Sequence, residues 1–186
     1  MTFISTGKAF RDMETLCRAF MGLKARLKIF APMKWGPENY EEVLSHFKAP
    51  NIEICFVEKL DLKGYKSVLD YIYAELKAAD CSMVICKHVN FGVGFTAVLD
   101  AMVCQTAIVA TYHKDNPIDI DKMGIGVTVP AEDVDALREK LQWLIDNRNS
   151  VEAFAKRGYD LIRERYNIRR VAHQVLSVML DNDKNK

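Results

Sequence analysis

Short continuous runs of hydrophobic residues alternate along the chain with longer stretches in which apolar residues recur every third or fourth position. The short runs show no polar alternation, which is typical of strands covered on both faces of a sheet. They predict strands at residues 3–6, 27–31, 52–57, 82–86, 107–110 and 127–129. The longer stretches predict helices at 12–23, 37–47, 64–79, 96–103, 133–145, 151–166 and 168–180, with one short helix within 112–123.

Strands that alternate with helices through short connections predict an α/β domain with a mostly parallel sheet. Right-handed crossovers leave few topologies, and the Rossmann-like, doubly wound order 3-2-1-4-5-6 is favoured for six strands. In that order the first and fourth strands are neighbours at the topological switch point. The loops that follow these two strands, residues 7–11 and 87–96, are therefore expected to meet at one crevice.

Both of these loops have the composition of an anion site. Gly92 and Gly94 precede a helix N-terminus, where unpaired N–H groups and the helix dipole attract phosphate, and Thr96 follows in the first turn. Lys8 and Arg11 stand in the other loop. Two local patterns thus indicate the same kind of ligand at the same crevice.

Composition narrows the class of protein further. The 186 residues are 49% hydrophobic and 27% charged, enough for one domain with a sizeable core. The 26 basic and 25 acidic residues give a net charge of +1, which argues against a nucleic-acid partner. The five scattered cysteines indicate reduced core thiols of a cytoplasmic protein, and no Cys-x-x-Cys suggests a metal. No apolar stretch reaches the roughly 20 residues of a membrane helix.

The first predicted strand begins at residues 2–5, directly after Met1. We therefore expect the chain to be a domain cut from a longer protein. The alternative is a natural small protein whose first strand begins at once. We expect the domain itself to comprise residues 1–180 and to be followed by a polar tail at 181–186.

A set of short motifs appears in a fixed order along nearly the whole chain. Residues 5–8 and 11–16 match Ser-x-Gly-Arg/Lys and Arg-Asp-x-x-Thr-Leu, and 126–137 match Gly-x-x-Val-Pro-x-x-Asp-x-x-x-Leu. Asp-Ala-Met at 100–102 and Gln-Thr-Ala-Ile-Val-Ala-Thr at 105–111 are similar to Glu-Ala-Met and Gly-x-Pro-Val-Val-Ala-Thr. This ordered set resembles the C-terminal, nucleotide-sugar-binding domain of retaining glycosyltransferases with the GT-B fold, of the glycosyl transferases group 1 type.

The chain also departs from that family pattern. Gly92 stands eight residues before Asp100, where the family has its first glutamate, and Asp100 shortens the second. Gln105 and Ala107 replace a glycine and a proline. The Gly-x-Thr loop at 94–96 is similar to a subset of such enzymes that lack the first glutamate. The resemblance therefore supports the phosphate site better than the sugar site.

The resemblance implies roles for particular residues. Lys8 and Arg11 would be catalytic, because fixed cations stabilise the charge on a departing nucleoside diphosphate. The donor would be bound by Gly7, Lys59, Leu60, His88, Gly92, Gly94, Phe95, Thr96 and Asp100. Among these, Asp100 would accept hydrogen bonds from the ribose, and the main chain of Lys59 and Leu60 would contact the base.

Each of these roles has an ordinary structural alternative. Lys8 and Arg11 could instead be solvated basic residues on a surface loop. Thr96 could instead be the N-cap of the helix that follows an ordinary loop. Asp100 is alternatively an exposed helix-surface acid, and His88 an ordinary loop residue.

The function expected from this resemblance is transfer of a sugar from a UDP- or GDP-sugar to a glycan or lipid-linked acceptor, as in polysaccharide biosynthesis. We expect no metal, a cytoplasmic location with peripheral contact at the inner face of the membrane, and an N-terminal acceptor-binding half that is absent here. Without that half the domain is expected to be inactive. A sugar-nucleotide epimerase and a degenerate, non-catalytic interaction domain are the alternatives. A dehydrogenase is disfavoured because no Gly-x-Gly-x-x-Gly follows the first strand, and a receiver domain because no acidic cluster does.

Overall fold

The computed structural model describes residues 1–183, with side chains as far as Leu180. A six-stranded parallel sheet forms its centre, in the order β5-β2-β1-β6-β7-β8. The strands are β1 (Thr2–Ser5), β2 (Arg26–Ala31), β5 (Ile52–Phe56), β6 (Cys81–Val84), β7 (Ala107–Thr111) and β8 (Gly126–Val129). This is the predicted order 3-2-1-4-5-6, so the α/β doubly wound fold is confirmed.

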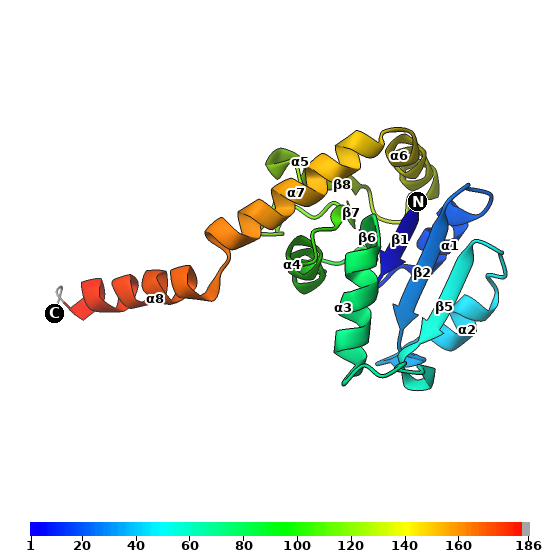
Figure 1. Cartoon of the computed structure of the whole chain (residues 1–186), viewed down its shortest axis with the longest axis horizontal. Coiled ribbons are helices and arrows are strands. Elements are labelled where there is room, and N and C mark those ends of the chain that lie inside the picture. The colour runs from blue at the N-terminus through cyan, green and yellow to red at the C-terminus, as the bar shows by residue number, and fades with distance from the viewer. Residues whose placement is uncertain (184–186) are drawn as a thin grey trace.

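Helices cover both faces of this sheet (Figure 1). One face carries α1 (Met13–Phe20), α2 (Tyr40–Ser45) and α6 (Val134–Asp146). The other face carries α3 (Val68–Ala78), α4 (Phe95–Val103), α5 (Ile120–Met123) and α7 (Arg148–Arg165). A short 3-10 turn, η1 (Val57–Lys59), follows β5.

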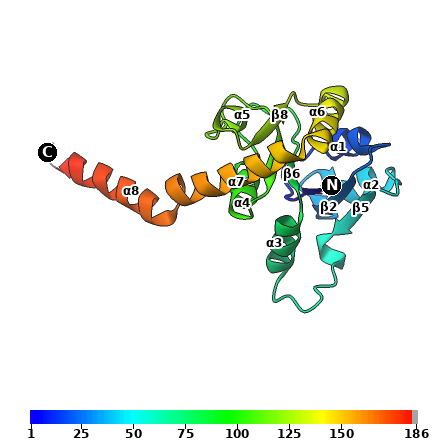
Figure 2. The same ribbon diagram turned by 45° about the horizontal axis from the view of Figure 1, so that its top comes forward.

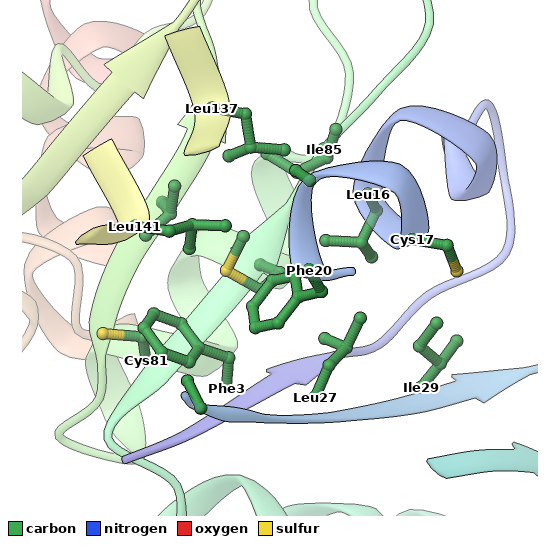
Figure 3. Packing of buried hydrophobic residues seen from close by; sticks show 14 of the residues in the cluster. Phe3, Leu16, Cys17, Phe20, Leu27, Ile29, Cys81, Ile85, Leu137 and Leu141 are labelled. Atoms are coloured by element: carbon green, nitrogen blue, oxygen red, sulfur yellow. The ribbon is translucent and has the colours of Figure 1, made fainter. Parts of the chain in front are cut away.

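Alternate residues of each strand supply the two halves of the core. Phe3 of β1 points to the α1 side, where its ring meets Phe20 edge-to-face at a centroid distance of 5.2 Å (Figure 3). Ile4, the next residue, packs against the α3 side. Burial on both faces explains why the strands lack polar alternation. Cys17, Cys81, Cys86 and Cys104 are buried free thiols, as predicted.

Two predicted helices begin later in the structure than their hydrophobic pattern suggested. Residues 34–39 form a hairpin of β3 (Lys34–Trp35) and β4 (Glu38–Asn39), because Gly36 turns the chain at φ +57° before Pro37. Helix α2 starts only after Asn39, whose side chain accepts a hydrogen bond from the amide of Glu42. Helix α3 likewise starts after Ser67, which caps it. The predicted starts at residues 37 and 64 were therefore wrong.

Helix α8 (Ile168–Asp183) runs beyond its predicted end at residue 180 and leads away from the sheet in both views (Figures 1 and 2). The predicted polar tail at 181–186 thus begins as helix, and residues 184–186 lie outside the described part of the chain. Within residues 1–183, no helix combines the length and the apolar character needed to cross a membrane.

Candidate functional site

The loops that follow β1 and β6 are joined by backbone hydrogen bonds at the switch point. The amide of Asp12 donates to the carbonyl of Ile85 at 3.1 Å, and the amide of Lys87 donates to the carbonyl of Phe10 at 2.9 Å. Arg11 and Cys86 lie opposite each other in this antiparallel bridge. The two loops are therefore joined as one unit at the carboxyl edge of the sheet.

Arg11 is buried within this unit, with 4% of its surface exposed. Its Nε donates to the carbonyl of Thr6 at 3.1 Å, and its Nη1 donates to the sulfur of Cys86 at 2.8 Å. Two glycines leave room for the guanidinium. A Cβ at Gly7 would lie 2.6 Å from Nη2, and one at Gly94 would lie 3.5 Å from Nη1. Arg11 is therefore not the solvated surface base that was the alternative at this position.

The Arg11 guanidinium forms no salt bridge in the part of the chain that the structure describes. Among the described residues, no carboxylate lies within salt-bridge distance of Arg11. Burial raises the pKa of the Cys86 thiol, and this effect outweighs the opposite effect of the Arg11 charge. The sulfur accordingly stays protonated at neutral pH and does not neutralise the positive charge of the buried Arg11.

Helix α4 begins directly beside Arg11. Gly94 is its N-terminal cap at φ +80°, and it offers no side chain to the free amides of the first turn. A Cβ at this position would lie 2.5 Å from Cγ1 of Val84, so only glycine fits without a shift. The cap is therefore not Thr96, which is exposed in the first turn. The positive end of the α4 dipole and the Arg11 guanidinium lie side by side.

These groups line a cavity of about 740 Å³ between the two loops, α3 and α4. The structure brings most of the predicted site residues together there. The lining includes Gly7, Lys8, Arg11, Gly92, Gly94, Phe95, Thr96 and Asp100. The shared location follows from the switch point, because residues after neighbouring parallel strands emerge at the same edge of the sheet.

Three predicted residues lie outside the cavity lining. The Lys59 ammonium pairs with Glu41 at 2.9 Å. Leu60 packs with the core beneath α3, and Val57 of η1 lines the cavity instead. His88 is exposed, and its amide lies 3.5 Å from an Oε1 acceptor of Glu132.

Lys8 lies at the rim of the cavity and is exposed, unlike Arg11. Its Nζ stands 4.2 Å from the ring centroid of Trp35 in β3, a cation–π contact. The loop beneath it is held by the Tyr40 hydroxyl, which donates to the Lys8 carbonyl at 2.7 Å. The β3–β4 hairpin and the start of α2 thus support the rim.

Asp100 of α4 is paired with a residue that sequence reasoning missed. The hydroxyl of Tyr73 in α3 donates to Oδ1 of Asp100 at 2.8 Å. Burial, and then this contact with the carboxylate, raise the pKa of the Tyr73 phenol to about 12. The sequence gave no sign of this polar partner, because Tyr73 lies among the regularly spaced apolar residues of α3.

An apolar wall faces the charged end of the cavity. Val57 of η1 and Val68, Leu69 and Ile72 of α3 line it. Leu69 is part of this wall although 56% of its surface is exposed. Phe10 and Phe91 also line the cavity, and sequence reasoning missed both of them. A cavity with a cationic end and an apolar wall suits a ligand that combines phosphate with a planar base.

Comparison with known families and proteins agrees with this geometry. The family model described as glycosyl transferases group 1 matches residues 51–161, which is more than half of the chain. No curated protein sequence gives a significant match.

Several solved structures share the fold. A sucrose-phosphate synthase from Thermosynechococcus elongatus matches with a TM-score of 0.77 at 16% identity, over 100% of this chain and 46% of its own. HepE from Anabaena in complex with UDP-glucose matches with a TM-score of 0.72 at 10% identity, over 97% of this chain and 48% of the HepE chain. The C-terminal domain of LpcC, a glycosyl transferase group 1 family protein from Francisella tularensis, matches with a TM-score of 0.64 at 17% identity. The match covers 90% of this chain and 86% of the LpcC domain.

The chain spans about half the length of the first two of these proteins and most of the third, which is itself a C-terminal domain. At these identities the likeness shows the fold, which is that of the C-terminal half of a GT-B glycosyltransferase.

Proposed function

The chain belongs to the glycosyl transferases group 1 family, and from this premise we propose that it is the nucleotide-sugar-binding half of a glycosyltransferase. Residues 1–180 form the donor-binding domain in this proposal. The acceptor is a glycan or a lipid-linked acceptor, held by the N-terminal half of the full enzyme. The full enzyme acts in polysaccharide biosynthesis in the cytoplasm, with peripheral contact at the inner face of the membrane.

The observation that carries the proposal is the burial of Arg11, which is 4% exposed and has no carboxylate within salt-bridge distance among the described residues. A buried charge without a counter-ion is unfavourable, so a bound anion would stabilise it. The free amides at the start of α4 favour phosphate at the same place. A nucleoside diphosphate supplies two phosphates, one for Arg11 and the α4 N-terminus and one for Lys8 at the rim.

The same charges suit the chemistry of sugar transfer. The bond between the anomeric carbon of the donor and the phosphate oxygen breaks, and the nucleoside diphosphate leaves with the bonding electrons. The acceptor hydroxyl oxygen forms the new bond to the anomeric carbon, and its proton passes to the departing phosphate. Negative charge therefore develops at the phosphate, where Arg11, Lys8 and the α4 dipole are already fixed. These groups supply the positive charge for the leaving group from the protein itself.

The remainder of the cavity suits a nucleoside. The base would pack against Val57, Val68 and Ile72, and the ribose hydroxyls would donate to the carboxylate of Asp100, which Tyr73 holds in place. Lys59, Leu60 and His88 take no part in this proposal, because they do not line the cavity. HepE was crystallised with UDP-glucose, which makes a UDP-sugar the first donor to test.

Isothermal titration calorimetry of the chain with UDP, GDP and ADP tests the proposal. We expect submillimolar binding of at least one nucleotide, and binding of its unphosphorylated nucleoside that is at least tenfold weaker. Submillimolar binding of none of them, with an intact fold by circular dichroism, would overturn the proposal. Equal affinities for nucleoside and nucleotide would show that Arg11 does not bind phosphate.

One observation favours a second candidate, a non-catalytic domain of the same fold. A Cβ at Gly92 would lie 2.9 Å from Oδ1 of Asn116 and 3.2 Å from the carbonyl of Asp115. The position of the family's first glutamate is thus packed against the loop that follows β7. A purely structural domain predicts that charge reversal at Lys8 and Arg11 leaves the function of the full protein unchanged, whereas the donor-site proposal predicts its loss.

A further inference from the structure

Two partly exposed phenylalanines contact each other where they line the cavity. The rings of Phe10 and Phe91 meet edge-to-face, with a centroid distance of 5.3 Å and an interplanar angle of 83°. They come from the two loops that flank Arg11, and both line the cavity. Phe10 is 41% exposed and Phe91 is 51% exposed. Neither ring belongs to the buried hydrophobic clusters, so core packing does not explain the pair.

The backbone of Phe10 is held in an unfavourable conformation. Its φ is +56°, a left-handed value that residues other than glycine, asparagine and aspartate rarely adopt. The hydrogen bonds from Lys87 to the Phe10 carbonyl and from Asp12 to the Ile85 carbonyl clamp the loop on both sides of Arg11 and maintain this conformation. Such strain clusters at ligand sites, where the surrounding structure fixes it.

The order of the strands separates the loop of Phe91 from the turn that follows β5. The apolar wall for the base comes from η1, which follows the edge strand β5, and from α3. Phe10 directly precedes Arg11 in the loop after β1, and Phe91 lies in the loop after β6, the neighbouring strand on the side away from β5. A nucleotide sugar whose base lies on the apolar wall and whose phosphates lie at Arg11 would extend its sugar toward the loop after β6, where Phe91 contacts Phe10.

We propose that Phe10 and Phe91 form a stacking platform for the glycosyl group of the donor, a hexopyranose. This inference rests on the proposed function and names the part of the site that holds the sugar. One face of a pyranose ring presents C–H groups, which pack on the face of an aromatic ring. Gly92 offers no carboxylate for the sugar hydroxyls, so the adjacent Phe91 ring is the main surface for the sugar.

The test compares a nucleoside diphosphate with its glucosyl ester. The chain is titrated with whichever of UDP, GDP and ADP it binds, and then with the matching UDP-glucose, GDP-glucose or ADP-glucose. We expect Phe91→Ala to weaken binding of the glucosyl ester by about fivefold to tenfold relative to the bare diphosphate. Phe91→Tyr keeps an aromatic face and should restore the ratio. Trp143→Ala removes an aromatic side chain of comparable exposure, 42%, in α6, and should change neither affinity.

The possible results separate this inference from the proposed function. If the unchanged chain binds none of the diphosphates, the proposed function fails and the platform fails with it. If the diphosphate binds normally and Phe91→Ala leaves the ratio of the two affinities unchanged, the platform alone is overturned. Equal weakening of both ligands would also overturn it, because the ring would then act on the phosphate loop and not on the sugar.

Discussion

Arg11 and Cys86 lie 75 residues apart in sequence and are joined by a 2.8 Å hydrogen bond from the guanidinium to the sulfur. The contact ties the loop after β1 to the loop after β6 at the point where the chain reverses its order of strands. A thiol kept protonated by burial accepts this hydrogen bond without neutralising the cation. The charge of Arg11 is therefore available to a ligand.

Substitution of Arg11 by methionine distinguishes a role of the guanidinium in nucleotide binding from a role in the stability of the fold. Methionine keeps much of the apolar volume and removes a buried charge that has no carboxylate partner among the described residues. Replacing buried ionic groups by apolar ones is often neutral or stabilising. We expect the free energy of unfolding of Arg11→Met to change by less than about 1 kcal/mol or to rise. Nucleoside diphosphate affinity should fall at least tenfold, because a charge-assisted contact is lost.

Urea unfolding and calorimetric titration measure the two effects independently. Arg18→Met is the matched control, since Arg18 lies on the exposed face of α1 and pairs with Glu14. It should leave nucleotide affinity unchanged. Undiminished binding by Arg11→Met would show that the guanidinium only fastens the loops together.

The arrangement of the sheet was predictable because it depends on features that repeat. Buried parallel strands need apolar residues on both faces, so Phe3 and Ile4 are both core residues although they point in opposite directions. Helix caps also act locally. Asp12 was expected to begin α1, and its carboxylate accepts a hydrogen bond from the amide of Thr15 at 3.0 Å. The crevice at the switch point follows from the strand order.

The rest of the site depends on contacts between distant segments, which no local pattern encodes. The hydrogen bond between Tyr73 and Asp100 joins two helices on the same face of the sheet. The phenylalanine pair joins two loops whose separation is set by the bridge between Arg11 and Cys86. Lys8 carried a motif match, but its contact with Trp35 depends on a hairpin that the pattern assigned partly to a helix.

Gly94→Ala should destabilise the protein more than the backbone angle alone requires. Both Gly94 and Gly22 have φ near +80°, at +80° and +83°, so alanine is strained by about 1–2 kcal/mol at either place. Only at Gly94 does the new methyl meet a neighbour, Cγ1 of the buried Val84 at 2.5 Å, while Gly22 has open space. Overpacking adds about 1–3 kcal/mol.

The free energies of unfolding of the two alanine variants are compared by urea unfolding. Because the backbone strain is similar at both positions, the difference between the two variants measures the cost of the steric contact with Val84. Gly94→Ala should also weaken nucleotide binding, because the start of α4 moves relative to Arg11. Equal destabilisation of Gly94→Ala and Gly22→Ala would contradict the close packing of Gly94 against β6.

The hydrogen bond from Tyr73 to Asp100 makes stability depend on pH in the alkaline range. Burial and the neighbouring carboxylate raise the pKa of this phenol to about 12, whereas in the unfolded chain the pKa is about 10. Between these values the folded state retains a proton that the unfolded state has lost. Stability from this group is therefore complete below about pH 10 and declines as the pH rises toward 12.

Tyr73→Phe removes the titrating hydroxyl and leaves the ring. At pH 8 we expect the variant to be less stable by about 1 kcal/mol, the usual net value of one hydrogen bond. Urea unfolding of both proteins at intervals from pH 8 to 11.5 should show this difference shrinking above pH 10. Tyr112→Phe, at a residue 62% exposed, is the control and should show no such convergence. A difference that stays constant over this range would mean that Asp100 does not hold the Tyr73 proton, and that the ribose site lacks the support inferred for it.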